Sequence, residues 1–256
     1  MTAPAPEAPD VRVARSSYRA RFDECGPDAL ARASALLRWA QDVAWIHSER
    51  RGFGREWYAE RDLAWVVRGL ELRMLAPIRT GTTVEVETQV VGFRRVMARR
   101  RTEVRAPDGS LSALVVNDWV MTDVRRAAPA RVPPEFPALF GVEHEAFEPI
   151  RVALPPTPDD APRLSVVARA HEIDPMHHVN NAAYLDWLDE AIETADASGA
   201  AALASLPRAY RVEYLLPVER GVPHEAAAWR REDGGWAYRL VRGDGPDALR
   251  GTLTTA

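Results

Sequence analysis

The sequence predicts an α+β protein built from two copies of one unit, in which a single long helix packs against an antiparallel sheet. Three observations lead to this prediction. Short stretches recur in the same order in both halves, each half has one helical apolar stripe followed by alternating apolar segments, and a proline-rich segment separates the halves. The chain of 256 residues has room for two domains of about 100–150 residues each.

Proline density marks the boundary between the copies. Nine of the 20 prolines fall between residues 127 and 163. Because proline lacks an N–H donor and clashes with a preceding helical turn, we expect neither a regular helix nor a central strand there, but a linker that crosses a surface. The expected organisation is a flexible tail over 1–10, an N-terminal copy over 11–126, the linker over 127–163 and a C-terminal copy over 164–256.

The two copies are related by a nearly constant shift in residue number. The matching stretches are Ser17–Glu24 with Ser165–Glu172, Trp39 with Trp187, and Leu70–Pro77 with Tyr210–Pro217. The shift is 148 for the first two pairs and 140 for the third, so the second copy is eight residues shorter between them. Three matches in order at a held spacing indicate a duplication.

Each copy is expected to begin with a short strand, over Ser17–Phe22 and Ser165–Ala170, and to continue with a helix. Apolar residues three and four apart form one helical face in each copy. They are Leu36, Leu37, Ala40, Val43 and Ala44 in the first, and Tyr184, Leu185, Leu188, Ala191, Ile192 and Ala195 in the second.

Alternating segments follow each helix and predict strands. In the first copy Thr83–Val90 and Leu111–Met121 alternate, and Asp108-Gly109 between such runs is typical of a hairpin turn. Asp233–Gly235 and Gly243–Pro246 have the matching place in the second copy. We expect the two sheets to pair edge to edge, since this removes one exposed edge from each.

The densest polar cluster lies where the first strand of the second copy leads into its helix. Asn180 and Asn181 come just before the apolar stripe, where asparagine caps the first free N–H groups, and Asp174 and His178 lie beside the positive end of the helix dipole. Acyl hydrolysis needs a base and donors for an oxyanion. Asp174 can activate water or attack the carbonyl itself, and the N–H groups that open the helix can hold the oxyanion.

The first copy serves as an internal comparison. At the shift of 148, Gly26 stands in the place of Asp174 and Leu30 in the place of His178. Arg32 and Ala33 stand in the places of Asn180 and Asn181. The features of the fold persist there while the polar residues are replaced. Only the second copy is therefore expected to carry chemistry.

These residues resemble a known motif. His178-Val-Asn-Asn181, preceded by Asp174 and followed by Tyr184 and Trp187, resembles the signature of hotdog-fold thioesterases, most closely the fatty acyl-acyl carrier protein thioesterases with two tandem copies. The resemblance implies a tandem hotdog fold and hydrolysis of an acyl thioester, carried by acyl carrier protein or coenzyme A, to free acid and thiol. The expected site has Asp174, His178 and Asn181 as catalytic residues, and Asn180, Tyr184 and Trp187 as substrate-binding residues.

The sequence departs from this family at three positions. Met176 replaces an asparagine of the motif, and Pro217 and Val218 stand where plant members have a Glu-Cys pair. The spelling Asp-Pro-Met-x-His-Val-Asn-Asn also resembles acyl-CoA thioesterases with a single hotdog, so the carrier stays open. Two other functions are compatible with these changes: a non-catalytic acyl-thioester-binding protein, and a hotdog dehydratase acting on a hydroxyacyl thioester.

Composition limits the other function classes. With 33 basic and 37 acidic residues the chain shows no basic excess for nucleic acid, and no apolar run is long enough to span a membrane. Cys25 is the single cysteine, which excludes a disulfide within the chain. The histidines near Asp174 lack metal-ligand spacing. We expect a cytoplasmic protein without cofactor or metal, either a monomeric pseudo-dimer or a homodimer.

A basic stretch lies in strand-like sequence of the first copy, at Arg94-Arg95 and Arg99–Arg101. It has two interpretations. It could steer an acidic carrier protein by long-range attraction, or it could be the solvated face of a sheet.

Overall fold

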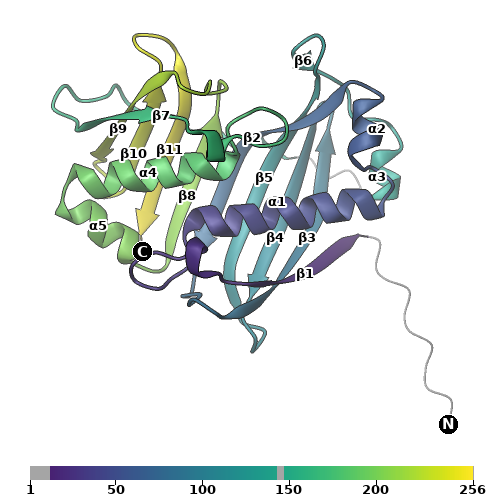
Figure 1. Ribbon diagram of the computed structural model, residues 1–256, viewed down its shortest axis with the longest axis horizontal. Helices are drawn as coiled ribbons and strands as arrows, with labels where there is room; N and C mark the ends of the chain where they lie inside the picture. Colours follow the sequence, from purple (N-terminus) through teal and green to yellow (C-terminus); the bar gives the residue numbers. More distant parts are fainter. Residues whose placement is uncertain (1–11, 143–146, 256) are drawn as a thin grey trace.

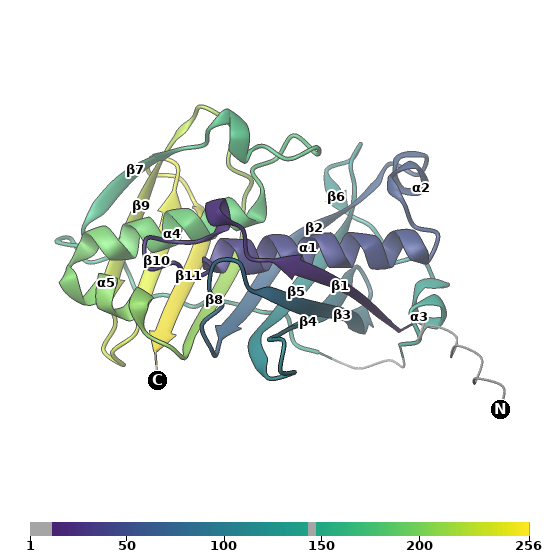
Figure 2. The ribbon, with the colours of Figure 1, turned by 60° about the horizontal axis from the view of Figure 1, so that its bottom comes forward.

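The computed structural model describes residues 12–142 and 147–255; the expected tail over 1–10 lies outside them. Within the described residues the strands form one 11-stranded antiparallel sheet, and the two long helices lie nearly end to end across the same face of it (Figures 1 and 2). The predicted α+β class and the tandem hotdog arrangement are confirmed, since each half of the sheet curves around one long helix.

The two copies have the same elements in the same order. The first contains β1 (Val13–Arg19), α1 (Ala33–Arg50), α2 (Arg55–Ala59), β2 (Leu63–Met74), β3 (Thr83–Arg94), β4 (Met97–Arg105) and β5 (Leu111–Asp123). The second contains β7 (Arg163–Val167), α4 (Asn181–Ala195), α5 (Ala197–Ala204), β8 (Arg208–Tyr214), β9 (Pro223–Arg230), β10 (Trp236–Val241) and β11 (Asp247–Thr255). Between them lie β6 (Ala128–Pro129) and α3 (Phe136–Leu139).

The strand order shows how the copies join. It runs β1-β3-β4-β5-β2-β8-β11-β10-β9-β7, so β2 and β8 pair at the centre and the halves meet edge to edge, as predicted. In this pairing Glu71 lies opposite Arg211, which is its own counterpart at the shift of 140. A pseudo-two-fold axis therefore passes between these two residues.

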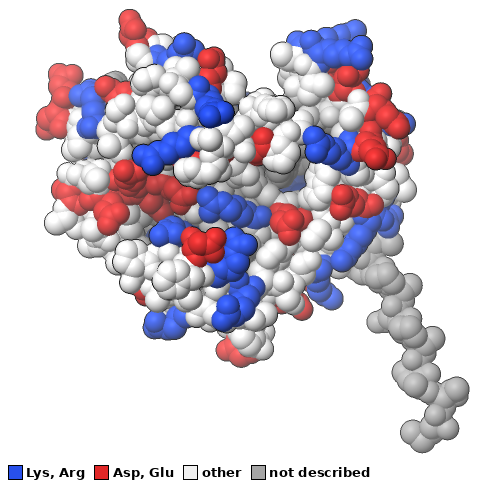
Figure 3. Space-filling view, in the orientation of Figure 1, with Lys and Arg blue, Asp and Glu red and all other residues white. Residues whose placement is uncertain are grey.

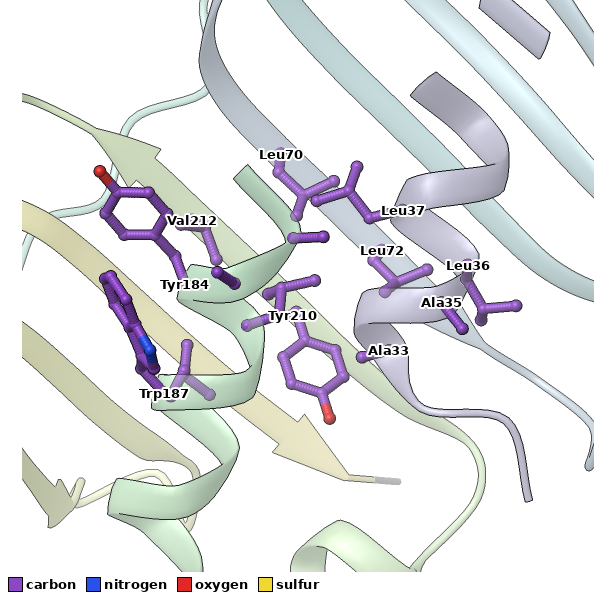
Figure 4. Packing of buried hydrophobic residues seen from close by; sticks show 14 of the residues in the cluster. Ala33, Ala35, Leu36, Leu37, Leu70, Leu72, Tyr184, Trp187, Tyr210 and Val212 are labelled. Atoms are coloured by element: carbon purple, nitrogen blue, oxygen red, sulfur yellow. The ribbon is translucent and has the colours of Figure 1, made fainter. Parts of the chain in front are cut away.

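The predicted helical stripes form the core. All five apolar residues predicted for α1 are buried, as are those of α4 except the half-buried Ala195. Figure 4 shows Leu36 and Leu37 of α1 facing Leu70 and Leu72 of β2. Strand β3 alternates as predicted, with Val84, Val86, Thr88 and Val90 all buried.

In both copies the bounds of the first strand differ from the predicted ones. The strands begin and end earlier than Ser17–Phe22 and Ser165–Ala170, because a short 3₁₀ turn follows each of them, over Phe22–Glu24 and Ala170–Glu172. In the first copy the side chain of Glu24 accepts a hydrogen bond from the N–H of Arg21, which holds the chain in the turn and ends the strand.

The linker crosses the sheet face opposite the helices, and two buried carboxylates hold it there. Asp118 accepts from the N–H of Ile150 (2.7 Å), and Glu213 accepts from the N–H of Val152 (3.0 Å). Between these two contacts Ile150 lies directly on Gly69, where a Cβ would come within 2.7 Å of the Ile150 Cβ. The linker is therefore a packed part of the fold.

One expectation for the linker is wrong, since it contains the four-residue helix α3. Pro137 lies in the first turn of α3, where a missing N–H costs no hydrogen bond. Proline thus limits the helix to one short turn without preventing it.

Candidate active site

The turn that precedes α4 has a regular backbone geometry. The N–H of Asp174 donates to the carbonyl of His178 (2.8 Å), and the N–H of His177 donates to the carbonyl of Asp174 (2.9 Å), with His177 at a φ of 61°. The first copy repeats the turn at Gly26–Leu30, where the corresponding bonds are both 2.9 Å long. The two copies therefore share this backbone and differ in the side chains that it carries.

Backbone groups orient the Asp174 carboxylate. Its Oδ1 accepts from the N–H of Met176 (2.8 Å) and from the N–H of His178 (3.2 Å), and the side chain is half-buried. No hydrogen bond to Oδ2 is found from any described residue. Because Met176 contributes its backbone, the exposed thioether in place of the family's asparagine does not disturb this orientation.

The first turn of α4 supplies a free donor close to this turn. Asn180 caps the helix, since its side chain accepts from the N–H of Ala182 (2.9 Å). Asn181 is the first helical residue, and its carbonyl accepts from the hydroxyl of Tyr214 (3.1 Å). Within the described part of the chain its N–H has no acceptor, as expected at the first position of a helix. This N–H carries the positive end of the helix dipole.

Tyr184 lies one turn into α4 and connects it to the loop after β8. Its hydroxyl accepts from the N–H of Val218 (3.2 Å), and its ring packs against Trp187 and Tyr214. Burial raises the pKa of Tyr184 to about 12, and the nearby charge of Asp174 contributes in the same direction. The hydroxyl is therefore protonated at neutral pH and can donate its proton in a hydrogen bond.

Trp187 has a structural partner that the sequence analysis missed. Its Nε1 donates to Glu172 (2.9 Å), and in the first copy Trp39 donates in the same way to Glu24 (3.0 Å). Since the copy without the polar cluster has this bond too, the contact belongs to the fold. The signal was present in the sequence, because both the tryptophan and the glutamate recur at the shift of 148.

The copies differ in how this turn is covered. In the first copy, the N–H of Ala31 donates to Ile78 and the N–H of Thr80 donates to Ala29, both at 2.9 Å, so the connection between β2 and β3 closes over the turn. Among the described residues of the second copy no equivalent bonds join the turn to residues 215–222, and the N–H of Val218 is bonded to Tyr184 instead. The Asp174 turn is therefore less sealed than its counterpart.

The expected residues thus come together around one turn and one helix start. Asp174, Asn180, Asn181 and Tyr184 lie within it, and His178 is exposed on the same turn. No group of three or more potential metal ligands gathers in residues 12–142 and 147–255. The same residues include no helix that is long and apolar enough to cross a bilayer. The arrangement places a carboxylate, a free helix N–H and a tyrosine hydroxyl on one turn and the first two turns of the helix that follows it.

Two family descriptions match the chain. The "Acyl-ACP thioesterase N-terminal domain" matches residues 12–140, and the "Acyl-ACP thioesterase C-terminal domain" matches residues 158–230.

Curated relatives with similar sequences are plant proteins. The "Palmitoyl-acyl carrier protein thioesterase, chloroplastic" of Cuphea hookeriana is 28% identical over 231 residues, covering 80% of this chain and 52% of the relative. The "Dodecanoyl-[acyl-carrier-protein] hydrolase, chloroplastic" of Cinnamomum camphora is 25% identical over 194 residues, covering 70% and 51%. The chain spans about half the length of the curated relatives that it matches.

Solved structures share the whole fold. The 12:0-ACP thioesterase of Umbellularia californica has a TM-score of 0.77 at 23% identity, covering 94% of this chain and 96% of that one. An acyl-ACP thioesterase of Bacteroides thetaiotaomicron has a TM-score of 0.76 at 16% identity, with the same coverage. At these identities the likeness shows the fold alone.

Proposed function

This chain belongs to the acyl-ACP thioesterase family, and from that premise we propose that it hydrolyses an acyl thioester of acyl carrier protein to a free carboxylic acid and a thiol. The names of the plant relatives support hydrolysis over acyl binding alone or dehydration. They also support acyl carrier protein over coenzyme A as the carrier.

The observation that carries the proposal is the difference between the two turns. The backbone is the same, but the second copy places a carboxylate where the first has Gly26, and it places that carboxylate beside a helix start with a free N–H. A carboxylate held by two N–H donors keeps a defined direction, which general base catalysis requires. The fold alone does not require it, since the first copy forms the same turn without one.

In the proposed reaction, Asp174 removes a proton from water, and the resulting hydroxide attacks the thioester carbonyl carbon. The N–H of Asn181 donates to the oxygen that becomes negative, and the helix dipole stabilises that charge. When the tetrahedral intermediate collapses, the carbon–sulfur bond breaks, the acid forms, and the sulfur leaves as a thiolate that takes up a proton. Asn180 holds the helix start, and Tyr184 and His178 orient the acyl group and the sulfur.

The test measures thiol release from acyl carrier protein and coenzyme A thioesters over a range of chain lengths. Wild-type protein should release thiol faster from the carrier protein. Asp174→Asn should lower kcat by at least about 100-fold, because it removes the base while keeping the acceptor oxygen that orients the turn.

Asp28→Asn is the matched control. Asp28 also accepts a backbone N–H within its turn, from Leu30 at 3.0 Å, but it lies in the first copy. Its substitution should leave kcat unchanged. Near-normal turnover by Asp174→Asn would overturn the assigned base, and a wild-type protein that keeps acyl thioesters intact would overturn the proposed function.

A further inference from the structure

A cation is buried inside the N-terminal copy, and within residues 12–142 and 147–255 no carboxylate is paired with it. Arg100 of β4 is 8% exposed, and no described carboxylate forms an ion pair with it. Its guanidinium contacts His47 Nδ1 (3.1 Å), donates to the hydroxyl of Ser48 (3.2 Å) and lies 5.5 Å from the ring centre of Phe140. Burial lowers the pKa of Arg100 to about 10, so the group is charged at neutral pH. The C-terminal end of α1, which carries His47 and Ser48, offsets part of this charge.

Two further donors lie beside this cation, and neither has an acceptor among the described residues. Asn117 of β5 is directly opposite Arg100 in the sheet and therefore on the same face, and its Nδ2 is buried without a partner. Trp119 is two residues further along β5, again on that face, and its Nε1 is buried without a partner. Leaving a buried donor without an acceptor destabilises the fold, because the donor has lost its hydrogen bonds to water. We refer to Arg100, Asn117 and Trp119 as the donor cluster.

The C-terminal copy shows that the fold does not need a charged residue there. The sheet register matches Arg100 to Trp236 and Asn117 to Leu253, since β4, β5 and β2 pair in the same way as β10, β11 and β8. Trp236 and Leu253 are almost completely buried. A tryptophan and a leucine therefore fill the same place in the second copy, where the Nε1 of Trp236 is also buried without a partner, whereas the first copy adds a cation and an amide for which the described residues supply no negatively charged acceptor.

Apart from His47, Ser48 and Tyr58 beside Arg100, the residues around the donor cluster include several apolar side chains. Leu70 lies opposite Asn117 and faces Leu37 of α1 (Figure 4), and the aromatic rings of Phe93 and Phe140 belong to the neighbouring buried cluster. His47 is 14 residues from Ala33, where α1 begins near the centre of the molecule, or about 21 Å along the helix axis. A ligand that fits this place combines an acceptor of negative charge with an apolar chain.

We propose that the donor cluster binds a carboxylate carried at the end of an apolar chain, inside the N-terminal copy beneath the C-terminal half of α1. The carboxylate would neutralise Arg100 and accept from Asn117 and Trp119. The choice of ligand rests on the proposed function, which supplies two sources: the free acid that the reaction releases, and the far end of a dicarboxylic acyl thioester. The two sources share one chemistry and are separated by experiment.

The first experiment measures binding by calorimetry, using the Asp174→Asn protein so that no turnover interferes. Dodecanoate should bind at least about tenfold more tightly than methyl dodecanoate, which has the same chain without the charge. Arg100→Met should abolish this preference. Arg101→Met is the matched control, because Arg101 is the next residue on β4, points to the opposite face and pairs with Glu103. It should leave the preference intact.

A second set of variants guards against a folding defect in Arg100→Met. Asn117→Leu and Trp119→Phe remove donors and keep the cation, and each should weaken dodecanoate binding several-fold without weakening the methyl ester. Equal affinity of the wild-type site for both ligands, or a preference that survives in all three variants, would overturn the proposal.

The second experiment separates the two sources. It compares kcat/KM for an acyl thioester and for its counterpart with a terminal carboxylate, in wild-type protein and in Arg100→Met. A preference for the carboxylated substrate that depends on Arg100 identifies the thioester as the source, and dependence in the binding experiment alone identifies the free acid. If the protein hydrolyses no thioester, the proposed function is wrong. The binding experiment still decides whether the donor cluster binds a carboxylate.

Discussion

At the scale of single residues, Asp174, which we propose as the catalytic base, shows how backbone groups alone can orient a carboxylate. The N–H groups of Met176 and His178 hold one of its oxygens, and any residue with an N–H can supply them. The asparagine that the family has at position 176 is therefore not needed for this task. The neighbouring Asn180 has a different task, since its side chain caps α4.

The raised pKa of Asp189 predicts how the stability of the protein depends on pH. Burial raises its pKa from 3.8 to about 7, and Arg208 and a hydrogen bond with Tyr210 oppose this rise without cancelling it. One of its carboxyl oxygens is buried without a partner. Between about pH 4 and pH 7 the unfolded chain therefore loses this proton while the folded protein keeps it. The contribution of Asp189 to the free energy of unfolding falls as pH rises through this window and is constant above it.

We predict that Asp189→Asn removes this dependence, because the amide is neutral at every pH. Measured by thermal unfolding from pH 4 to pH 8, the Tm of the variant relative to wild type should rise with pH up to about pH 7. Glu190→Gln changes the next, exposed residue of α4 and should show no such trend. A constant difference between Asp189→Asn and wild type would mean that this carboxyl titrates normally.

At the scale of elements, β4 explains the basic stretch of the sequence. Consecutive strand residues point to opposite faces, so Arg99 faces the linker and pairs with Asp118 (2.7 Å), Arg100 faces α1, and Arg101 faces outward again. Neither interpretation of the stretch as a whole is therefore correct for Arg100. Because consecutive residues of a strand point to opposite faces, Arg100 lies on a different face from Arg99 and Arg101.

The linker is the second element with a distinct role, since it binds both halves of the sheet. Gly69 sits at an irregularity in the β2–β5 pairing and lets Ile150 approach the backbone closely. Asp118 on one side and Glu213 on the other then fix the linker in place. Arg151 adds an ion pair with Glu213 at 2.6 Å. The linker thus contacts both copies and stabilises the boundary between them.

We predict that Gly69→Ala destabilises the protein by about 1–3 kcal/mol, because the added methyl group overlaps Ile150 and displaces the linker. Urea unfolding measures the change. Gly54→Ala is the control, since the nearest atom to its added methyl group, in the Glu49 side chain, is 3.9 Å away. If both variants lose equally little stability, the linker is not seated on Gly69 in solution.

At the scale of the whole molecule, the pseudo-two-fold axis is marked by opposite charges at equivalent positions. Glu71 pairs with Arg211, its counterpart at the shift of 140, and Arg38 pairs at 3.0 Å with Asp186, its counterpart at the shift of 148. Figure 3 shows acidic side chains gathered over α4 beside basic ones where the two helices meet. Two identical copies would place like charges at both positions, so the duplication allowed charges that favour this pairing of the copies.

We predict that Glu71→Arg lowers stability and that adding Arg211→Glu restores it, because the reversed pair has the same attraction. A double-mutant cycle by urea unfolding should give a coupling of about 0.2–1 kcal/mol, the range for partly exposed pairs, and the coupling should shrink with added salt. Pairing Glu71→Arg with Arg73→Glu, on the same strand, tests for a general charge effect. Rescue by this second combination would argue against a specific pair across the axis.

The duplication, the order of elements and the location of the polar turn were all predictable from the amino-acid sequence. These depend on local patterns: helical and strand periodicity, proline density, and residues such as Asp174 and Asn181 that are close in the chain. The copy comparison within one chain was enough to show which half differs.

Contacts between residues that are distant in sequence became visible only in the folded chain. Folding brought Val218 to Tyr184, Ile150 onto Gly69, and placed Asn117 opposite Arg100 beneath α1. Sequence patterns do not specify such contacts, because they depend on strand register and on the closure of long loops. For the polar groups the consequence is large, because burial removes their hydrogen bonds to water and makes the partner that tertiary structure supplies, or its absence, decisive for stability.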